Sequence, residues 1–434
     1  MIQWLYGLQH FGIKLGLDNI RALLEILDHP QRRYASAHIA GTNGKGSVAA
    51  MIDAMLGAGG VPSGLFTSPH LVRPNERIRL AGSDIQDGEL HRRLAEMRDT
   101  IERGLADGLL EVHPSFFEVI TATALRAFAD HGVQAAVLEV GLGGRLDATN
   151  AVEADVAVIV SIGLDHTKTL GPTLERIAHE KAGIIKPGRP VVSGATQPSV
   201  IEVLQEVCRE REAEYVDARE AVRLTGRDDD RFTLETAANR YPDLRCALPG
   251  RHQVENARIA VASLERLMAR LGMQPDLEAV REGLATVRWA GRLQWIEPRD
   301  GLPRMLLDGA HNPPGIAALT SYLQGLKPPL PVLLVGATSG KPLRDLLGPL
   351  APHVDGVVVT RPPVERGLDP DAVAEEIRSL FGTVESLQEP AQALDRACEL
   401  AGKRRPVLVT GSVYLVGEIL SLLSSEPAPG PVAM

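Results

Sequence analysis

The sequence predicts an α/β protein of two domains, a larger one with a mostly parallel sheet and a smaller one of the same class. Three observations point to this class. Short apolar runs rich in β-branched residues alternate with helical patterns along the whole chain. At 434 residues, the chain is too long for one ordinary hydrophobic core. Its composition, 44% hydrophobic and 23% charged, is typical of a globular protein rather than of a disordered one.

The first domain is expected to hold buried strands separated by helices. Apolar residues recur at helical spacing between positions 48 and 56, which predicts a helix over residues 47–56. A short, polar, strand-like stretch at 210–249 predicts an appended β segment, and a helix is expected to follow at 254–271. The expected strands of this domain lie at 36–40, 64–67, 135–140, 156–162 and 190–193.

A second α/β series is expected after a linker. The segment WAGRLQWIEPRDGLPR at 289–304 is interpreted as this linker, because its proline and glycines mark turns between compact parts. We place the boundary near residue 295, which divides the chain into domains at 1–294 and 295–434. The expected strands of the second domain lie at 305–307, 332–335, 356–360 and 407–410.

Charge and composition exclude several classes of partner. Lys and Arg number 46 and Asp and Glu 55, and the formal net charge of −9 argues against nucleic acid or an anionic membrane as the main partner. No window reaches the roughly 18 unbroken apolar residues of a membrane span, and the N-terminus lacks a signal-peptide pattern. The three cysteines are far apart and form no C-x-x-C pair. We therefore expect a cytoplasmic protein whose anionic ligands meet locally placed cations.

The segment GTNGKGS at 41–47 lies between an expected strand and an expected helix, which is the setting in which a glycine-rich loop binds phosphate. Glycines let backbone N–H groups approach an anion, and Lys45 adds a mobile cation. The match to the usual P-loop pattern is incomplete, because Ile39 replaces an early glycine and Gly46 separates Lys45 from Ser47. A turn that merely joins strand and helix is the alternative. A lysine flanked by glycines at a helix start favours the phosphate site.

Polar residues follow four of the expected strands, and ligands bind at strand ends in open α/β sheets. Besides the loop at 41–47, these residues are Ser68, Glu139 and His166. A carboxylate inside the apolar run AVLEVGLGG is costly to bury unless it faces a metal or a cation. Glu139 with Ser68 suits magnesium bound to a nucleotide. His166 could serve a second ion or orient a ligand, and a loop histidine bonded to backbone is its alternative.

Other segments carry weaker signals when taken alone. Lys181, near the end of an expected helix, fits an ordinary surface lysine, and Asn256 at a helix start could donate to a base or a phosphate. Asp308 and His311 follow a strand of the second domain. An acidic side chain there can hold ribose hydroxyls, and the histidine could meet a carboxylate.

The turn GLGGRLDATN at 141–150 contains three glycines followed by Arg145 and Asp147. It fits a tight crossover between elements. The arginine beside an expected phosphate site suggests a substrate-positioning loop instead.

In their order along the chain, these segments resemble the Mur ligase superfamily, and closely its folate branch of dihydrofolate synthases and folylpolyglutamate synthases. The resemblance covers almost the whole chain and implies a P-loop-containing N-terminal domain with a smaller, Rossmann-like C-terminal α/β domain. It also implies ATP-dependent ligation of L-glutamate to dihydropteroate or tetrahydrofolate (poly)glutamate through an acyl phosphate. The segments that carry it are GTNGKGS, TSPHLVRPNERI, SFFE, LEVGLGGRLDATN, SIGLDHTKTLG, EKAGIIKPG, LPGRHQVENA, WAGRLQ, LDGAHNP and VTGSVYLVGE.

The resemblance implies roles for individual residues on the nucleotide side. Two magnesium ions are expected, with the ligands Ser68, Glu139 and His166. Lys181 matches a lysine that is carbamylated in this family, and His311 matches a residue near the incoming glutamate. Lys45, Lys181, His166 and His311 are therefore the expected catalytic residues. The expected ATP-binding residues are Gly44, Lys45, Gly46, Ser47, Asn256, Arg292 and Asp308.

The resemblance also implies contacts with the pterin part of the substrate. The expected residues are Leu15, Gly16, Ser115, Phe116, Phe117, Glu118, Leu146, Asp147 and Ala148. Two segments depart from the family pattern. WAGR has an alanine where a proline often precedes the glycine, and GATSGKP at 336–342 lacks the usual acidic ending, although Lys341 remains available for glutamate.

Three other functions share the phosphate loop. They are a Mur-type ligase acting on a different carboxylate, a P-loop NTPase that forms no bond, and a non-catalytic nucleotide-binding module. Only 40 residues precede Gly41, too few for the separate UDP-sugar domain of peptidoglycan-precursor ligases. The second-domain and pterin-side segments favour the folate ligase. Its expected partners are small molecules only, and the chain is expected to be a monomer.

Overall fold

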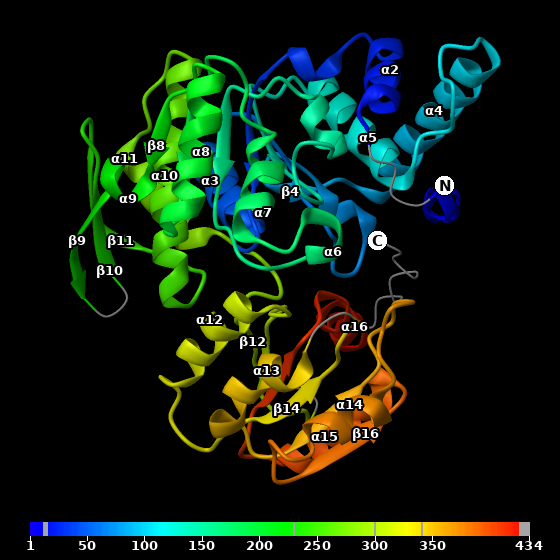
Figure 1. Ribbon diagram of the computed structural model, residues 1–434, viewed down its shortest axis with the longest axis vertical. Coiled ribbons are helices and arrows are strands. Elements are labelled where there is room, and N and C mark those ends of the chain that lie inside the picture. The colour runs from blue at the N-terminus through cyan, green and yellow to red at the C-terminus, as the bar shows by residue number, and fades with distance from the viewer. Residues whose placement is uncertain (12–15, 229–230, 299–300, 340–341, 425–434) are drawn as a thin grey trace.

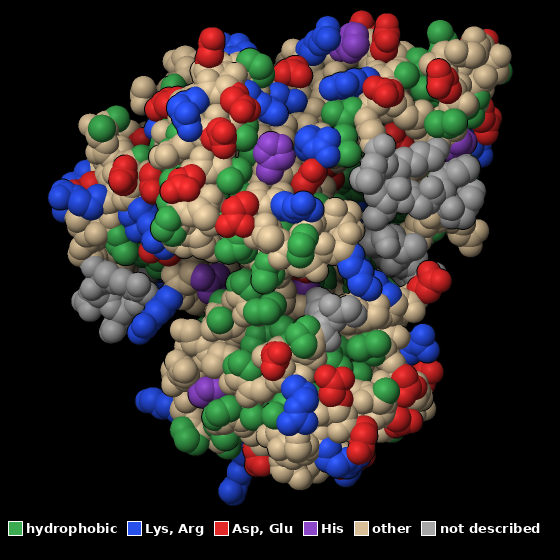
Figure 2. All heavy atoms as spheres, viewed as in Figure 1, with side chains coloured by type: hydrophobic (Ala, Val, Ile, Leu, Met, Phe, Trp, Pro, Cys, Tyr) green, Lys and Arg blue, Asp and Glu red, His purple; other side chains and the backbone are tan. Residues whose placement is uncertain are grey.

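Two open sheets organise the chain, one in each of the two bodies visible in Figure 1, the upper in blue to green and the lower in yellow to red. The computed structural model describes residues 1–434 except 12–15, 229–230, 299–300, 340–341 and 425–434. Hydrophobic side chains lie at the junction of the two bodies on the face that Figure 2 shows. The two-part α/β architecture expected from the sequence is confirmed.

The sheet of the upper body has eight strands in the order β4-β3-β2-β5-β1-β6-β7-β8. From β2 to β8 all neighbours pair in parallel, whereas the short β3 and β4 form an antiparallel edge that the sequence patterns did not reveal. The strands are β1 (Ala35–Ala40), β2 (Ser63–Phe66), β3 (Ile78–Leu80), β4 (Ser83–Asp84), β5 (Ala135–Glu139), β6 (Val156–Ile159), β7 (Val191–Ser193) and β8 (Tyr215–Asp217).

Helices cover both faces of this sheet because successive strand residues point to opposite sides. On β5, Val137 joins the core beneath α3, α10 and α11, whereas Leu138 packs with α2, α4 and α5. A third cluster packs α7 and α8 against β6. The helices are α1 (Ile2–Gly7), α2 (Asp18–Ile26), α3 (Lys45–Ala58), α4 (Asp87–Ala106), α5 (Phe116–Asp130), α6 (Thr167–Leu170), α7 (Leu174–Ala182), α8 (Pro198–Glu210), α9 (Ala218–Ala221), α10 (Arg251–Arg270) and α11 (Leu277–Thr286).

The appended β segment expected at 210–249 is only partly correct. Its first part contains β8, which joins the main sheet, and the short α9. The rest forms an antiparallel sheet in the order β11-β10-β9, at the left edge of Figure 1. Tyr241 is fully buried there, and its hydroxyl donates to Glu265 of α10 at 2.8 Å. The strands are β9 (Arg223–Asp228), β10 (Arg231–Glu235) and β11 (Arg240–Arg245).

The lower body is a six-stranded sheet in the order β12-β13-β17-β14-β15-β16, parallel except for β12. β12 lies inside the segment expected to be a linker, so that expectation is wrong for residues 294–296. Helices α12, α13 and α14 cover one face, and α15 and α16 cover the other. The elements are β12 (Gln294–Ile296), β13 (Met305–Leu307), β14 (Val332–Val335), β15 (Val357–Thr360), β16 (Val384–Leu387), β17 (Val407–Thr410), α12 (Pro313–Leu323), α13 (Leu343–Leu347), α14 (Pro370–Ile377), α15 (Pro390–Ala401) and α16 (Val413–Ser424).

Candidate active site

The carboxyl ends of four parallel strands lie side by side, because β2, β5, β1 and β6 are consecutive in the sheet. The polar residues that the sequence predicts to form one site lie at the ends of these four strands or in the loops that follow them. The strand order therefore places these loops along one edge of the sheet, where open α/β sheets bind their ligands.

The loop after β1 turns sharply into α3, which begins at Lys45. Gly44 has φ of 83°, a backbone conformation that favours glycine, and a Cβ there would lie 2.9 Å from Asn256 Oδ1. Lys45 Nζ donates to the Gly41 carbonyl at 3.1 Å. The loop thus presents backbone N–H groups at a helix N-terminus beside a lysine, an arrangement suited to phosphate.

Two elements distant in sequence cover this loop. From α10, Gln253 donates to Ser47 Oγ at 3.4 Å and accepts from Asn256 Nδ2 at 2.9 Å. From the segment before β12, the indole of Trp289 lies so close to Gly46 that a Cβ there would be 2.7 Å from the ring. Gln253 and Trp289 were not predicted from the sequence, although both belong to segments with a predicted role, RHQVENA and WAGR.

Glu139 ends β5 and is 5% exposed. Its Oε2 accepts from the Ser68 backbone N–H at 3.2 Å. Burial raises the pKa of Glu139, while the charge of Lys45, the Ser68 N–H and the charge of Arg292 act in the opposite direction. The Ser68 hydroxyl is buried and has no hydrogen-bond partner among the described residues. Glu139 and Ser68, which are joined through the Ser68 N–H, thus offer a carboxylate and an unpaired hydroxyl, oxygen ligands of the kind that magnesium prefers, so these residues fit the ion that the sequence predicts.

His166 follows β6 and has φ of 49°. Burial lowers its pKa to about 4, although neighbouring Asp165 acts to raise it. The imidazole is therefore neutral at pH 7, the form that can bind a metal ion. Its Nε2 lies 4.0 Å from Asp165 Oδ1.

Hydrogen bonds join the upper body to the lower at this edge. The side-chain amides of Asn43 and Asn312 donate to each other at 2.9 and 3.0 Å, and Asn312 also donates to Asp165 Oδ2 at 2.7 Å. His311 Nε2 lies 3.5 Å from the same oxygen. Burial alone would raise the pKa of Asp165, but its contacts with His311 hold that pKa far below its usual range. The phosphate loop is thus tied directly to the N-terminus of α12.

Lys181 on α7 is a buried residue, not the exposed lysine that its sequence alone suggested. Burial lowers its pKa to about 7, and the charge of Lys45 lowers it further, whereas Asp165 and Asp147 raise it. Lys45 also acts electrostatically on Glu139 and His166. These four expected site residues therefore share one electrostatic neighbourhood, and Lys181 has a neutral amine available near pH 7.

From the lower body, Asp308 contributes a buried carboxylate after β13. Its oxygens accept from the backbone N–H groups of Leu293 and Ala310, both at 2.9 Å. Burial raises the pKa of Asp308, and the charge of Arg292 opposes this rise. The same arginine also opposes the rise at Glu139, so its guanidinium acts on a carboxylate from each body.

Two of the three segments that hold the expected pterin-side residues, 115–118 and 146–148, meet in the structure. A Cβ on Gly141 would lie 2.6 Å from the Phe117 ring and 3.0 Å from Asp147 Oδ2, which brings α5 against the turn at 141–147. The Phe116 ring stacks on Tyr6 with centroids 6.0 Å apart. Glu118 accepts from Asn19 Nδ2 of α2 at 3.2 Å, close in sequence to Gly16, whereas Leu15 lies outside the described residues.

Several of these side chains also have local structural partners. The Asp147 carboxylate accepts from the Leu142 N–H at 2.8 Å and from the Thr149 hydroxyl at 2.5 Å, and it begins the turn that contains buried Ala148, with half-buried Leu146 before it. Arg145 pairs with Glu180 at 2.8 Å, so its charge is balanced within the protein. Lys341, the cation expected near glutamate, lies outside the described residues.

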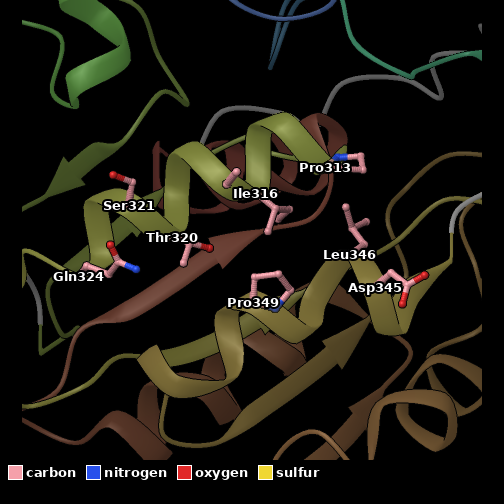
Figure 3. A pocket seen from close by; sticks show the side chains of 9 residues that line it. Pro313, Ile316, Thr320, Ser321, Gln324, Asp345, Leu346 and Pro349 are labelled. Atoms are coloured by element: carbon pink, nitrogen blue, oxygen red, sulfur yellow. The ribbon is translucent and has the colours of Figure 1, made fainter. Parts of the chain in front are cut away.

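Two hollows in the surface lie away from this cluster. A pocket of about 280 Å³ is formed by α12, α13 and the turn at 348–353, with Ile316, Thr320 and Leu346 in its wall (Figure 3). A second, of about 950 Å³, lies at the amino ends of β1 and β5. Neither is lined by an expected site residue. Converging polar groups at the strand ends, rather than these hollows, define the candidate site.

The described part of the chain holds neither a ready-made metal cluster nor a membrane-spanning helix. Within it, no three His, Cys, Asp or Glu side chains gather as a metal cluster, so oxygens of the nucleotide would have to complete the expected magnesium ligands Ser68, Glu139 and His166. None of its helices combines the length and the apolar character needed to cross a bilayer.

Comparison with known families agrees with this geometry. Residues 39–264 match the Mur ligase middle domain, and residues 291–413 match the Mur ligase glutamate ligase domain. The first match spans most of the upper sheet and the second most of the lower one. The chain therefore belongs to the Mur ligase family.

Relatives with known names place it in the folate branch. The chain is 33% identical to the dihydrofolate synthase/folylpolyglutamate synthase of Bacillus subtilis, over 96% of each chain, and 36% identical to that of Mycobacterium tuberculosis, over 95% of this chain and 90% of the other. Among solved structures, the M. tuberculosis folylpolyglutamate synthase complexed with ADP superposes with a TM-score of 0.89 at 35% identity, covering 98% and 99% of the two chains. Escherichia coli FolC in complex with DHPP and ADP gives 0.85 at 31%, covering 98% and 97%.

We predict that Ser115→Ala lowers the free energy of unfolding by about 1 kcal/mol, because its hydroxyl caps α5. Ser115 Oγ accepts from the Glu118 N–H at 3.4 Å and donates to Glu118 Oε2 at 2.8 Å. Chemical denaturation measures the change, with Asp276→Ala, which removes the cap of α11, as the matched control. An unchanged stability of the Ser115 variant beside a destabilised control would show that the hydroxyl does not act as a cap.

Proposed function

We propose that this enzyme uses ATP to join L-glutamate to the carboxylate of dihydropteroate, of tetrahydrofolate (poly)glutamate, or of both. The observation that carries the proposal is the convergence of Lys45, Glu139 and Lys181 at the strand ends, with Asp308 and His311 facing them from the second sheet. Relatives named for the two glutamate-adding activities support it.

The proposed reaction has two steps. The substrate carboxylate attacks the γ-phosphate of ATP, which gives an acyl phosphate and ADP. The glutamate amine then attacks the acyl carbon, phosphate leaves, and the amine loses a proton as the amide forms. Both steps bring anions together, so they need local positive charge in a chain whose formal net charge is −9.

On the nucleotide side, the loop from Gly44 to Ser47 would hold the phosphates of ATP through backbone N–H groups and Lys45. Ser68, Glu139 and His166 would hold magnesium, with two ions proposed; when bound, the metal neutralises charge on the phosphates as the carboxylate approaches. Asn256, whose side-chain oxygen lies close to Gly44, would contact the nucleotide. Arg292 and Asp308 would bind it from the other body.

On the acceptor side, we propose that the pterin lies against the two segments that meet at Phe117 and Asp147. The Ser115 and Asp147 side chains are engaged in a cap and a turn, so backbone groups and the aromatic rings would supply most of the contacts. His311 would stand near the incoming glutamate. The proposed pterin-side set is Leu15, Gly16, Ser115, Phe116, Phe117, Glu118, Leu146, Asp147 and Ala148.

We also propose the division of labour between the two parts of the chain. Residues 1–294 would form the ATP- and folate-binding domain and residues 295–434 the glutamate ligase domain. The separate sheets support this division, and β12 begins at Gln294, one residue before the proposed boundary. A cytoplasmic monomer that acts on small molecules only completes the proposal.

The proposed reaction can be tested directly. Purified protein with ATP, magnesium and glutamate should release phosphate and yield a product heavier by one glutamate, detected by mass spectrometry. Dihydropteroate and tetrahydrofolate are assayed side by side, with glutamate omitted as the control. If neither acceptor gives a glutamate-dependent product, the proposed function is wrong.

We also predict that Glu139→Gln lowers turnover by about 10-fold or more, because the amide keeps the shape of the side chain but loses the metal-binding charge. Asp53→Asn is the matched control, since Asp53 is equally buried but pairs with Ser63 at 2.6 Å, away from the strand ends. Steady-state kinetics over a range of magnesium concentrations measures both variants. Turnover and magnesium dependence equal to wild type in Glu139→Gln would remove this residue from the site.

We further propose that Lys181 reacts with carbon dioxide to form a carbamate, because its neutral amine is available near pH 7. With ¹³C-labelled bicarbonate, the wild type should show a carbamate carbon signal by NMR that Lys181→Met lacks. Lys186→Met is the control, since Lys186 is also a buried lysine with a lowered pKa but donates to the Asn150 carbonyl. A wild type without the signal, or a signal that survives in Lys181→Met, would refute the modification.

A further inference from the structure

The loop that carries Ser68 also reaches the lower body. After β2, the chain runs through Ser68 to Leu71 and returns to β3 through a short turn at 74–77. Leu71 packs against the apolar cluster that α15 and α16 form on the second sheet. One loop of the upper body therefore carries an expected magnesium ligand, Ser68, and, three residues later, contacts the lower body through Leu71.

The contact of Leu71 with α16 depends on Gly417. Glycine inside a helix is less favourable than alanine by about 1 kcal/mol, and Gly417 is not among the glycines with positive φ. Close packing accounts for it instead. A Cβ at this position would overlap the Leu71 carbonyl oxygen and lie 2.9 Å from its carbonyl carbon. Both are backbone atoms, so a rotamer change could not relieve the overlap.

A second glycine borders Leu71 from the segment that joins the two bodies. A Cβ on Gly291 would lie 3.3 Å from Leu71 Cδ1 and 3.1 Å from Val416 Cγ1. The Gly291 carbonyl accepts from the Gly309 N–H at 2.9 Å, which anchors this segment to the loop after β13. Leu71 is thus held between the connecting segment and α16.

The loop between β2 and β3 is held rigid by hydrogen bonds among its own residues. The Glu76 carboxylate accepts from the N–H groups of Leu71, Val72 and Arg73 at 2.6, 2.8 and 2.8 Å. Buried Arg77 donates to His70 Nδ1 at 2.8 Å. With three consecutive N–H groups on one carboxylate, residues 70–77 would move together, so we expect a shift at Leu71 to be passed along the short chain to Ser68.

We propose that Gly417 and Leu71 are positioning residues, whose contact fixes the loop that holds Ser68 beside Glu139 and so makes the magnesium-bound nucleotide site depend on the lower body. The inference rests on the proposed function only in taking Ser68 and Glu139 as magnesium ligands. It concerns binding of the metal–nucleotide complex, which is measured without a folate or glutamate.

The test is Gly417→Ala, with titration calorimetry of ADP binding in the presence and absence of magnesium. Because an added methyl group must displace the loop, we expect the gain in ADP affinity from magnesium to fall by about 10- to 100-fold, the usual effect of losing a residue that orients a metal ligand. ADP binding without magnesium should stay as in the wild type. The matched control is Gly88→Ala on α4, where a Cβ meets nothing within 4 Å.

Circular dichroism checks that each variant folds. If Gly417→Ala does not fold, Leu71→Ala is used in its place, since it removes the apolar contact but no backbone group. The inference is wrong if magnesium raises the ADP affinity of the folded variant as much as it raises that of the wild type. It is also wrong if magnesium does not change the ADP affinity of the wild type. A wild type that binds magnesium-ADP but forms no glutamate adduct would refute the proposed function and leave this inference standing.

Discussion

Glu139 brings a carboxylate to a nearly buried position at the end of β5, and much of the surrounding structure stabilises its charge. Taking such a group out of water costs several kcal/mol unless cations and hydrogen bonds replace its hydration. Here Lys45 comes from the loop after β1, Arg292 from the segment between the bodies, and the Ser68 N–H from the loop after β2. Three parts of the chain that are distant in sequence thus surround this carboxylate, and the candidate site lies where they come together.

The same edge of the sheet is where the two bodies are joined. The reciprocal amide pair of Asn43 and Asn312 and the contacts to Asp165 link the phosphate loop to the start of α12. Leu71 seated on Gly417 links the Ser68 loop to α16. Residues that would bind nucleotide and metal are thus fixed partly by the second sheet.

On the proposed acceptor side, residues that the resemblance links to substrate also stabilise local structure. Ser115 caps α5, and Asp147 stabilises the turn after β5. Both residues therefore have structural roles that the sequence resemblance does not reveal. Lys181 shows the opposite case. Its position near a helix end suggested a surface residue, but it is 4% exposed and its pKa is lowered to about 7. Burial, which a single sequence does not show, is what changes the chemistry available to each of these side chains.

The central strands, α3 and the chemical character of the strand-end loops could be predicted from the sequence alone. Apolar runs and helical periodicity predicted the central strands and α3, because these patterns reflect local burial. GTNGKGS and the carboxylate inside AVLEVGLGG likewise marked the site. The tertiary structure decided what these loops meet. Asn43 and Asn312 are 269 residues apart in sequence, and the short strands β3, β4 and β12 pair only at sheet edges. Such contacts depend on how two separately formed sheets pack, which no local pattern encodes.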